Sequence, residues 1–138
     1  MTLVREAMVP EPRTLAADAT AQEAGELLLR PEVRAVFVCE DERLVGVVTR
    51  KTLVREVVAA GRDPRSTPVA GIVEPPNFTV PGDMDVDEAF RFLEEHDLER
   101  VPVTEGGRLV GVLSRSVLQR RLAEDEPPAE ESEEGTAI

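Results

Sequence analysis

Two short stretches of the 138-residue chain combine a glycine, a hydroxyl side chain and an arginine at the same spacing. Gly46–Arg50 reads Gly-Val-Val-Thr-Arg, and Gly111–Arg115 reads Gly-Val-Leu-Ser-Arg. A glycine inside an apolar strand pattern marks close approach by backbone or ligand, and a helix N-terminus offers free N–H groups to a phosphate. Packing glycines and capping hydroxyls explain each stretch as well, but the repeated register favours an anion site.

Positively charged side chains stand directly after both hydroxyls. Arg50 and Lys51 follow Thr49, and Arg115 follows Ser114. Cations in the first turn of a helix oppose the helix dipole, at a cost of roughly 0.3–1 kcal/mol each. A bound anion can offset this cost. An ion pair across two parts of the chain or a dimer interface can do the same, and the sequence leaves both explanations open.

Most other site chemistries lack the residues that they need. With Cys39 as the one cysteine and His96 as the one histidine, neither an internal disulfide nor a metal-ligand set nor a catalytic triad is supported. Cys39 is expected to be a small apolar strand residue and His96 to end a helix. The four phenylalanines and the net charge of −12 disfavour nucleic-acid binding. The sequence predicts a binding or regulatory protein, not an enzyme, with no metal or cofactor.

The elements that position these residues come in two copies. A shift of 65 residues aligns Val4–Arg55 with Val69–Arg120 without a gap, and 18 of the 52 aligned positions are identical. This similarity predicts a first motif at residues 1–60, a linker at 61–68 and a second motif at 69–123. Residues 124–138 hold seven acids and no bases, which predicts a disordered acidic tail.

Each motif contains the same order of elements. A short helical turn and a brief strand lead to a helix with a capping box, at Thr20–Glu23 in one copy and Asp85–Glu88 in the other. A hairpin and a second helix follow, and the junction between them carries Thr49 or Ser114. The expected hairpin strands are Ala35–Cys39 with Leu44–Thr49, and Arg100–Thr104 with Arg108–Leu113.

A helix–strand–helix–hairpin–helix unit that occurs twice resembles the CBS domain pair, also called a Bateman module. The matching residues are Pro10 and Pro75, Thr14 and Thr79, the Arg-Val-Pro-Val of Arg100–Val103 and the Gly-x-x-[Thr/Ser]-Arg of both junctions. The resemblance covers about 120 of the 138 residues. It implies an α+β fold, a tandem CBS repeat of two pseudo-twofold-related units that each have a small mixed sheet flanked by helices.

The resemblance also implies an adenosine-containing ligand in clefts shared by the two motifs, where the Thr or Ser of one copy faces the early Thr and the Val-x-Val strand of the other. One cleft is then expected to use Thr49, Arg50, Lys51, Thr52, Thr79, Val101, Pro102 and Val103, and the other Thr14, Val36, Phe37, Val38, Ser114 and Arg115. Pro102 has no N–H, so its strand is an edge or carries a bulge. Backbone groups beside it are expected to recognise adenine, although protection of an exposed edge explains the proline as well.

The two clefts are expected to be unequal. The position of the family's usual ribose-binding Asp holds Thr52 at the first junction and Val117 at the second. Thr52 keeps a hydroxyl, and two cations stand beside it where the second junction has one. We therefore expect the cleft at Thr49 to bind better, as one weak site per chain.

The implied function is regulatory: the module senses AMP, ADP, ATP or a related ligand and signals to an effector protein. The alternative is a degenerate pair that acts as an interaction or dimerisation scaffold without nucleotide. The wide apolar stripes of Leu53–Val58 and Val117–Leu122 predict a homodimer that uses these helices and the capping-box helices. The longest apolar run is Ala35–Cys39, and the first residues lack a secretory signal, so we expect a cytoplasmic protein without membrane contact.

Overall fold

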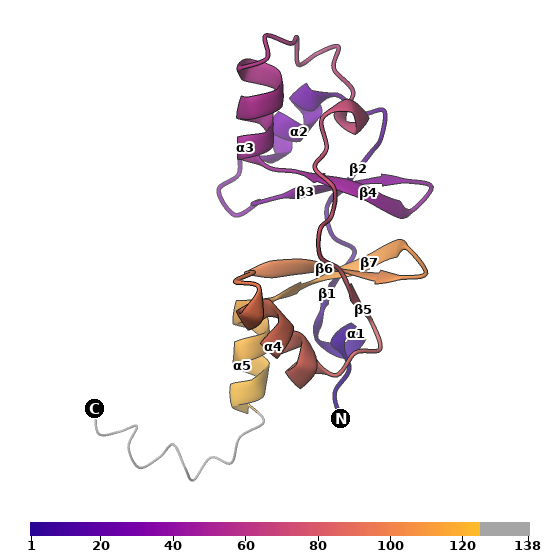
Figure 1. Cartoon of the computed structure of the whole chain (residues 1–138), viewed down its shortest axis with the longest axis vertical. Coiled ribbons are helices and arrows are strands. Elements are labelled where there is room, and N and C mark those ends of the chain that lie inside the picture. Colours follow the sequence, from indigo (N-terminus) through magenta and orange to yellow (C-terminus); the bar gives the residue numbers. More distant parts are fainter. Residues whose placement is uncertain (125–138) are drawn as a thin grey trace, which may run out of the picture.

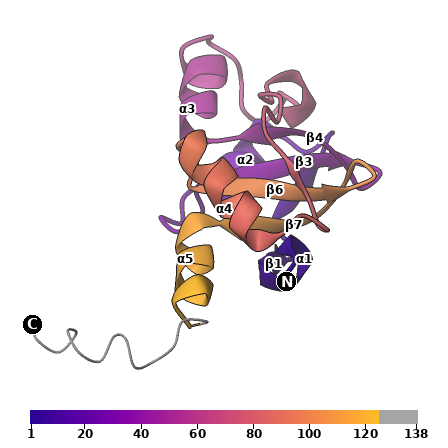
Figure 2. The ribbon, with the colours of Figure 1, turned by 60° about the horizontal axis from the view of Figure 1, so that its bottom comes forward.

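The structure, a computed structural model, describes the backbone of residues 1–124 and the side chains of residues 1–120. Two units lie one above the other along the long axis (Figure 1). Each unit turns its sheet toward the other unit and carries its helices on the outer face of that sheet (Figures 1 and 2). The expected α+β arrangement of two related units is confirmed.

The elements follow the same order in both units. The first unit holds β2 (Thr14–Ala16), α2 (Ala21–Leu27), β3 (Val36–Glu40), β4 (Arg43–Val48) and α3 (Arg50–Leu53), which continues as the π-helical turn η1 (Val54–Val58). The second holds β5 (Val80–Pro81), α4 (Val86–Glu95), β6 (Arg100–Glu105), β7 (Arg108–Ser114) and α5 (Arg115–Glu124). The elements α1 (Val4–Ala7) and β1 (Val9–Pro10) precede β2 in the chain, and the 3-10 turn η2 (Val69–Gly71) lies between η1 and β5.

Both units have a mixed sheet. β2 runs parallel to β3 and β3 antiparallel to β4, and β5, β6 and β7 repeat this pattern. β4 and β7 join the two sheets at the residue pair Arg43 and Arg108. On either side of this pair, the amides of Leu44 and Leu109 donate across the junction with N···O distances of 3.2 Å. Since these partners are related by the 65-residue shift, the pseudo-twofold axis passes between Arg43 and Arg108.

The leading segment of each sequence copy packs on the unit formed by the other copy. α1 lies beside the second unit (Figure 1), where the amide of Val4 donates to the carbonyl of Met84 at 2.8 Å and the Val4 side chain is buried in the second core. In the same way, the amide of Val69 donates to the carbonyl of Ala19 at 2.7 Å, and Val69 is buried in the first core. The predicted boundaries at residues 1–60 and 69–123 therefore describe copies in sequence, whereas in space the two leading segments are exchanged.

Corresponding positions of the two copies form the two cores. Fully buried valines and a leucine on the hairpins provide the centre of each core: Val36, Val38 and Val48 in the first unit, and Val101, Val103 and Leu113 in the second. Such side chains alternate along the strands with residues that face the other unit. The packing therefore leaves one face of each hairpin for the contact between units.

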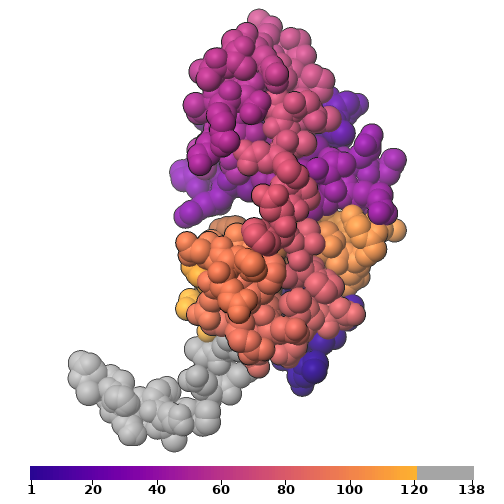
Figure 3. All heavy atoms as spheres, in the orientation of Figure 1, coloured from indigo at the N-terminus to yellow at the C-terminus, as the bar shows by residue number. Residues whose placement is uncertain are grey.

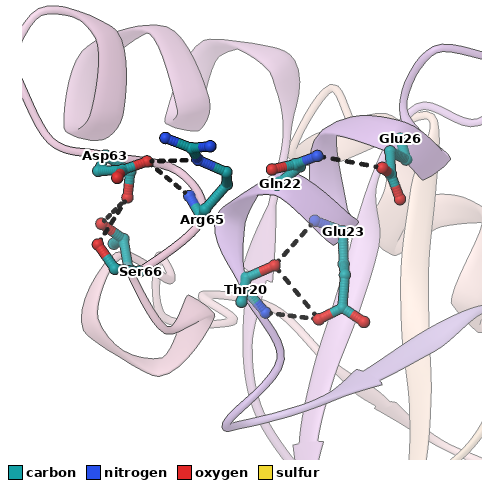
Figure 4. A network of polar contacts seen from close by, with 8 residues as sticks. Thr20, Gln22, Glu23, Glu26, Asp63, Arg65 and Ser66 are labelled. Atoms are coloured by element: carbon teal, nitrogen blue, oxygen red, sulfur yellow. Dashed lines mark hydrogen bonds and ion pairs between the residues drawn. The ribbon is translucent and has the colours of Figure 1, made fainter.

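Capping and turn residues match the sequence pattern with one exception. Thr20 and Glu23 form the predicted capping box, since the Thr20 amide donates to Glu23 Oε1 at 2.8 Å and the Glu23 amide to Thr20 Oγ1 at 3.2 Å (Figure 4). The capping box predicted at Asp85 is wrong: Asp85 Oδ2 accepts from the amide of Asp87 at 3.1 Å. The leading segment takes part there, because the amide of Val86 donates to the carbonyl of Thr2 at 2.9 Å.

The ends of the chain bear on two further expectations. The predicted acidic tail at 124–138 lies outside the described residues except for Glu124, which ends α5. Within residues 1–124, none of the helices combines the length and the apolar character that a membrane crossing requires.

Candidate functional site

A cleft of about 500 Å³ lies between the two units at the junction of β7 and α5. Its walls come from β1, the segment before β2, the segment from Glu32 to Phe37, β4, β6, β7 and the start of α5. The space-filling view shows the opposite crossing, where the pink segment that connects the two units passes over the near face beside the purple atoms of the first unit and the orange atoms of the second (Figure 3). Residues of both sequence copies line this cleft.

The cleft has an apolar floor and a positively charged rim. Phe37 and Pro102, which occupy equivalent positions in the two repeats, both line it, together with Val47 and Val112. Three exposed arginines, Arg13, Arg34 and Arg100, also line the cleft. Glu32 is the acidic residue of the lining. With three cations and one anion, the lining carries a formal charge of +2 on a chain of net charge −12.

The inner end of the cleft is the N-terminus of α5. Ser114 is 7% exposed, and its Oγ accepts from the amide of Val117 at 3.1 Å. Val117 also lines the cleft. The hydroxyl therefore caps the helix as predicted, and an isopropyl group occupies the position where the resemblance places a ribose-binding carboxylate.

At the other junction, both threonine hydroxyls take part in hydrogen bonds within the protein. Thr49 Oγ1 accepts from the amide of Thr52 at 3.3 Å, so Thr49 is a helix cap like Ser114. Thr52 is fully buried, and its hydroxyl donates to Glu74 Oε2 at 3.0 Å and accepts from the Thr49 amide at 3.0 Å. The Thr52 hydroxyl, which was expected to face a sugar, is bonded in this structure to Glu74 of the second sequence copy.

The residues at equivalent positions around the two junctions differ in charge. By the 65-residue shift, the positions of Arg13, Glu32 and Arg34 correspond to Phe78, Asp97 and Glu99 on the Thr49 side, and Arg100 corresponds to Ala35. Three further positions of the lining, Val9, Ala35 and Ser116, correspond to Glu74, Arg100 and Lys51, so the equivalent linings carry a net charge of +2 at Ser114 and −1 at Thr49. An anionic ligand is attracted to the first set of charges and repelled by the second.

Neighbouring groups offset the helix-dipole cost of both junction arginines. Arg50 donates from a guanidinium nitrogen to the carbonyl of Arg30 at 2.9 Å. Arg115 lies 3.9 Å from an Asp97 carboxylate oxygen and 3.8 Å from one of Glu99. These partners belong to the same unit, so neither a bound anion nor an interface is needed to explain the two arginines. Lys51 is exposed.

The paired glycines are explained by backbone crossing. A Cβ atom on Gly46 would lie 2.6 Å from Val73 Cβ and 2.7 Å from the carbonyl oxygen of Glu74. On Gly111 it would lie 2.9 Å from the carbonyl oxygen of Val9. The chain entering each unit from the other copy passes at these points, so the glycines have a packing role.

The strand of Pro102 was expected to be an edge strand or to carry a bulge; β6 lies between β5 and β7, and the irregularity is the one of the two that it has. β5 pairs with β6 at Val103 and Thr104, and a shift of register against β7 falls between these two residues. Pro102 itself pairs with Val112 of β7. Its place differs from the expectation, because Pro102 was assigned to the cleft at Thr49 and lines the cleft at Ser114.

The structure brings together Phe37, Pro102 and Ser114 from the predicted binding residues. The four predicted strand valines are fully buried, so their side chains belong to the cores: Val36, Val38, Val101 and Val103. Thr14 is exposed and lines a separate hollow with Cys39, and Thr79 is exposed as well. The sequence reading missed the rim arginines, whose signal was their replacement by Phe78, Glu99 and Ala35 in the aligned repeat.

Cys39 and His96 stand apart from the cleft. Partial burial raises the pKa of the Cys39 thiol above its ordinary value. His96 ends α4 and lies with its ring centroid 4.7 Å from that of Phe78 and 4.5 Å from that of Phe92. Among residues 1–124, no three His, Cys, Asp or Glu side chains gather as a metal site requires.

Comparison with known proteins supports the fold and the repeat. The CBS domain model matches residues 4–59 and 69–124. Hypoxic response protein 1 of Mycobacterium tuberculosis is 28% identical over 125 residues, which are 90% of this chain and 87% of that protein. The crystal structure of Hypoxic Response Protein I with two coordinated zinc ions superposes with a TM-score of 0.75 at 27% identity, over 88% of this chain and 99% of that one. The crystal structure of CBSX2 in complex with AMP superposes with a TM-score of 0.73 at 24% identity, over 90% and 98%. Because the family model matches both copies over most of their length, the chain belongs to the CBS domain family, as a tandem pair of CBS domains.

Proposed function

We propose that this chain is a cytoplasmic, non-enzymatic regulatory module that binds one adenosine nucleotide in the cleft at Ser114 and signals the binding to an effector protein. The observation that carries the proposal is the pairing of an apolar floor with three rim arginines. A nucleotide has the same two parts, a flat base that prefers apolar surroundings and a phosphate that prefers guanidinium groups.

The ligand is oriented by this division of the cleft. The base lies between Phe37 and Pro102, which line the cleft from the two units. The phosphate lies toward Arg13, Arg34 and Arg100, where a planar guanidinium donates two hydrogen bonds to phosphate oxygens. CBSX2, which shares the fold, has been crystallised with AMP, and this supports the choice of ligand class.

Signalling follows from the position of the cleft between the units. A ligand that contacts both units favours the arrangement in which those contacts are made. It shifts the population by no more than its difference in affinity for the two arrangements. The effector then recognises the favoured arrangement.

Titration calorimetry with AMP tests the proposal. We expect one site per chain, with an affinity that falls as salt concentration rises. Arg34→Gln removes a charge-assisted hydrogen bond of about 1.5–3 kcal/mol, which predicts a loss of affinity of at least tenfold. Lys51→Gln is the matched control, because it removes the same charge from the opposite junction and leaves the affinity within about twofold. Equal losses in both variants would contradict the proposed place of the phosphate.

The second candidate is a scaffold that works without nucleotide. Val117 favours it, because an apolar side chain faces the cleft where a ribose would need hydrogen bonds. No heat signal and no thermal stabilisation with AMP, ADP, ATP, NAD or S-adenosylmethionine would support this candidate. A ligand at 100 times its dissociation constant would otherwise add about 2.7 kcal/mol to the free energy of unfolding.

A further inference from the structure

The three rim arginines of the cleft at Ser114 lack an ion-pair partner among the side chains that the structure describes. No carboxylate of residues 1–120 forms an ion pair with Arg13, Arg34 or Arg100. Elsewhere in the same residues, carboxylates pair with Arg5, Arg55, Arg65, Arg108 and Arg115. Guanidinium groups of one sign gathered around a cleft attract anions, so this rim suits a negatively charged occupant.

The sequence supplies such charges directly after α5. Residues 124–138 hold seven acids and no bases, and four of the acids fall within Glu130–Glu134, which we call the acidic segment. Pro127 and Pro128 stand between α5 and this segment. Proline cannot continue a helix, because it lacks the backbone N–H and its ring clashes with the preceding turn. We therefore do not expect α5 to extend into the acidic segment.

The acidic segment is close enough along the chain to return to the cleft. α5 begins there, where Arg100 pairs with Ser114 of β7, and it runs away from the first unit (Figure 1). Its ten residues, Arg115–Glu124, span about 15 Å. An extended chain covers about 3.3 Å per residue, so residues 125–129 are sufficient to return over this distance. Glu130 is then the first acid that can reach the rim.

The opposite junction does not suit the same occupant. The 65-residue shift places Phe78 where the first rim has Arg13, and Glu99 where it has Arg34. The equivalent lining carries a net charge of −1 at Thr49 and +2 at Ser114. Four carboxylates are repelled by the first of these linings and attracted by the second. The charges therefore direct the acidic segment to one of the two clefts.

We propose that the acidic segment occupies the arginine rim of the cleft at Ser114 when no ligand is bound. A carboxylate accepts two hydrogen bonds from a guanidinium group, as a phosphate does. The segment takes the place assigned to the phosphate and leaves the apolar floor at Phe37 and Pro102 uncovered. Because the segment belongs to the same chain, its effective concentration at the rim is on the order of millimolar, which allows an individually weak contact to be occupied.

Occupation of the rim lowers the apparent affinity for nucleotide. The ligand binds only the fraction of molecules whose arginines are unoccupied, so the apparent dissociation constant rises as that fraction falls. This competition rests on the proposed function, because it requires a phosphate at the same arginines. The contact between the acidic segment and the rim does not require it.

A nitroxide spin label at residue 132 tests the contact without any nucleotide. Ser132→Cys in a Cys39→Ser background gives one labelling site within the acidic segment of the full chain. We expect the amide signals of Arg13 and Arg34 to be broadened and that of Thr52, at the opposite junction, to be unchanged. The broadening is expected to disappear at 1 M salt, where the Debye length is about 3 Å. Broadening confined to α5 would overturn the proposal.

A mixture of two kinds of chain identifies the source of the segment. One chain carries the spin label without isotope enrichment, and the other carries ¹⁵N without the spin label. We expect no broadening of Arg13 and Arg34 in the ¹⁵N chain, because each segment occupies the cleft of its own chain. Broadening in this mixture equal to that within one chain would assign the contact to a second copy and overturn the intramolecular proposal.

Titration calorimetry with AMP tests the competition. One variant neutralises the acidic segment at constant length, with Glu130→Gln, Glu131→Gln, Glu133→Gln and Glu134→Gln. Deletion of residues 135–138 is the matched control, because it shortens the chain without removing an acid. We expect the neutralised variant to bind AMP at least about threefold more tightly than the full chain, and the control to stay within about twofold.

The two measurements separate this proposal from the proposed function. Equal AMP affinities of the full chain and the neutralised variant would overturn the competition. If AMP binds to neither, the nucleotide proposal fails, and the spin label still decides whether the acidic segment occupies the rim.

Discussion

Thr52→Asp distinguishes a buried structural threonine from a ligand-binding one. The substitution restores the carboxylate that the family resemblance assigns to ribose. In this structure, however, Thr52 is fully buried and its hydroxyl lies 3.0 Å from Glu74 Oε2. The new carboxylate would face that existing one, so we expect the variant to be destabilised and to gain no affinity for nucleotide.

The size of the effect follows from burial and charge. A buried charge without a partner costs about 3–5 kcal/mol. Arg55 lies 3.8 Å from Glu74, but its side chain is 55% exposed, so it offsets little of this cost. Thr52→Val, which removes the hydroxyl without adding a charge, is expected to cost about 1–3 kcal/mol. Since small proteins have a free energy of unfolding of about 5–15 kcal/mol, the Asp variant is near the limit of folding.

Urea denaturation of Thr52→Asp and Val117→Asp provides the comparison. Val117 stands at the equivalent position, is partly exposed and lies in the first turn of α5, where a carboxylate interacts favourably with the helix dipole by about 0.3–1 kcal/mol. We expect Val117→Asp to change the free energy of unfolding by no more than about 1 kcal/mol. Equal stability of the two variants would refute the assignment of Thr52 to the structural network.

The pH dependence of the free energy of unfolding of Thr52→Asp separately tests whether the new carboxylate is destabilising in its charged form. Burial and the neighbouring carboxylate raise the pKa of the introduced Asp in the folded state above its value in the unfolded state. The folded state therefore binds the proton more tightly, and the deficit at pH 7 shrinks as the pH falls through the raised pKa. A deficit that grows on mild acidification would contradict this reasoning.

Three further outcomes are expected. Gly46→Ala is predicted to destabilise the folded protein by about 1–3 kcal/mol, because the added Cβ would lie 2.6 Å from Val73 Cβ. Thermal denaturation measures this loss, with Gly71→Ala as the control, because no atom lies within 4 Å of a Cβ at Gly71. Alkylation of Cys39 by iodoacetamide at pH 8 is predicted to be slower in the native protein than in urea, because the raised pKa lowers the thiolate fraction; equal rates would refute this. Removal of residues 125–138 is predicted to leave the sedimentation coefficient that of a dimer, because those residues contain few apolar side chains to bury; a monomer would contradict it.

Local sequence patterns predicted the elements and their repetition. The 65-residue periodicity identified two related units, and the hydroxyls at Thr49 and Ser114 were correctly expected to cap the helices that follow the hairpins. The capping box at Thr20–Glu23 formed as its spacing required. These features depend on residues three or four positions away in the chain, so a short stretch of sequence is enough to predict them.

The tertiary structure decided which surfaces these elements share. Arg13, Arg34 and Arg100 come from three separate segments with no common spacing, and they meet because the sheets of the two units face each other. Thr52 is hydrogen-bonded to Glu74, a residue of the other copy that no local spacing links to it. The exchange of the leading segments made this contact and placed Val9 and Glu74 against the glycines of the opposite repeats. Sequence alone determined the repeated unit, and long-range packing determined which side chains meet at each of its two junctions, because their partners lie in the other copy.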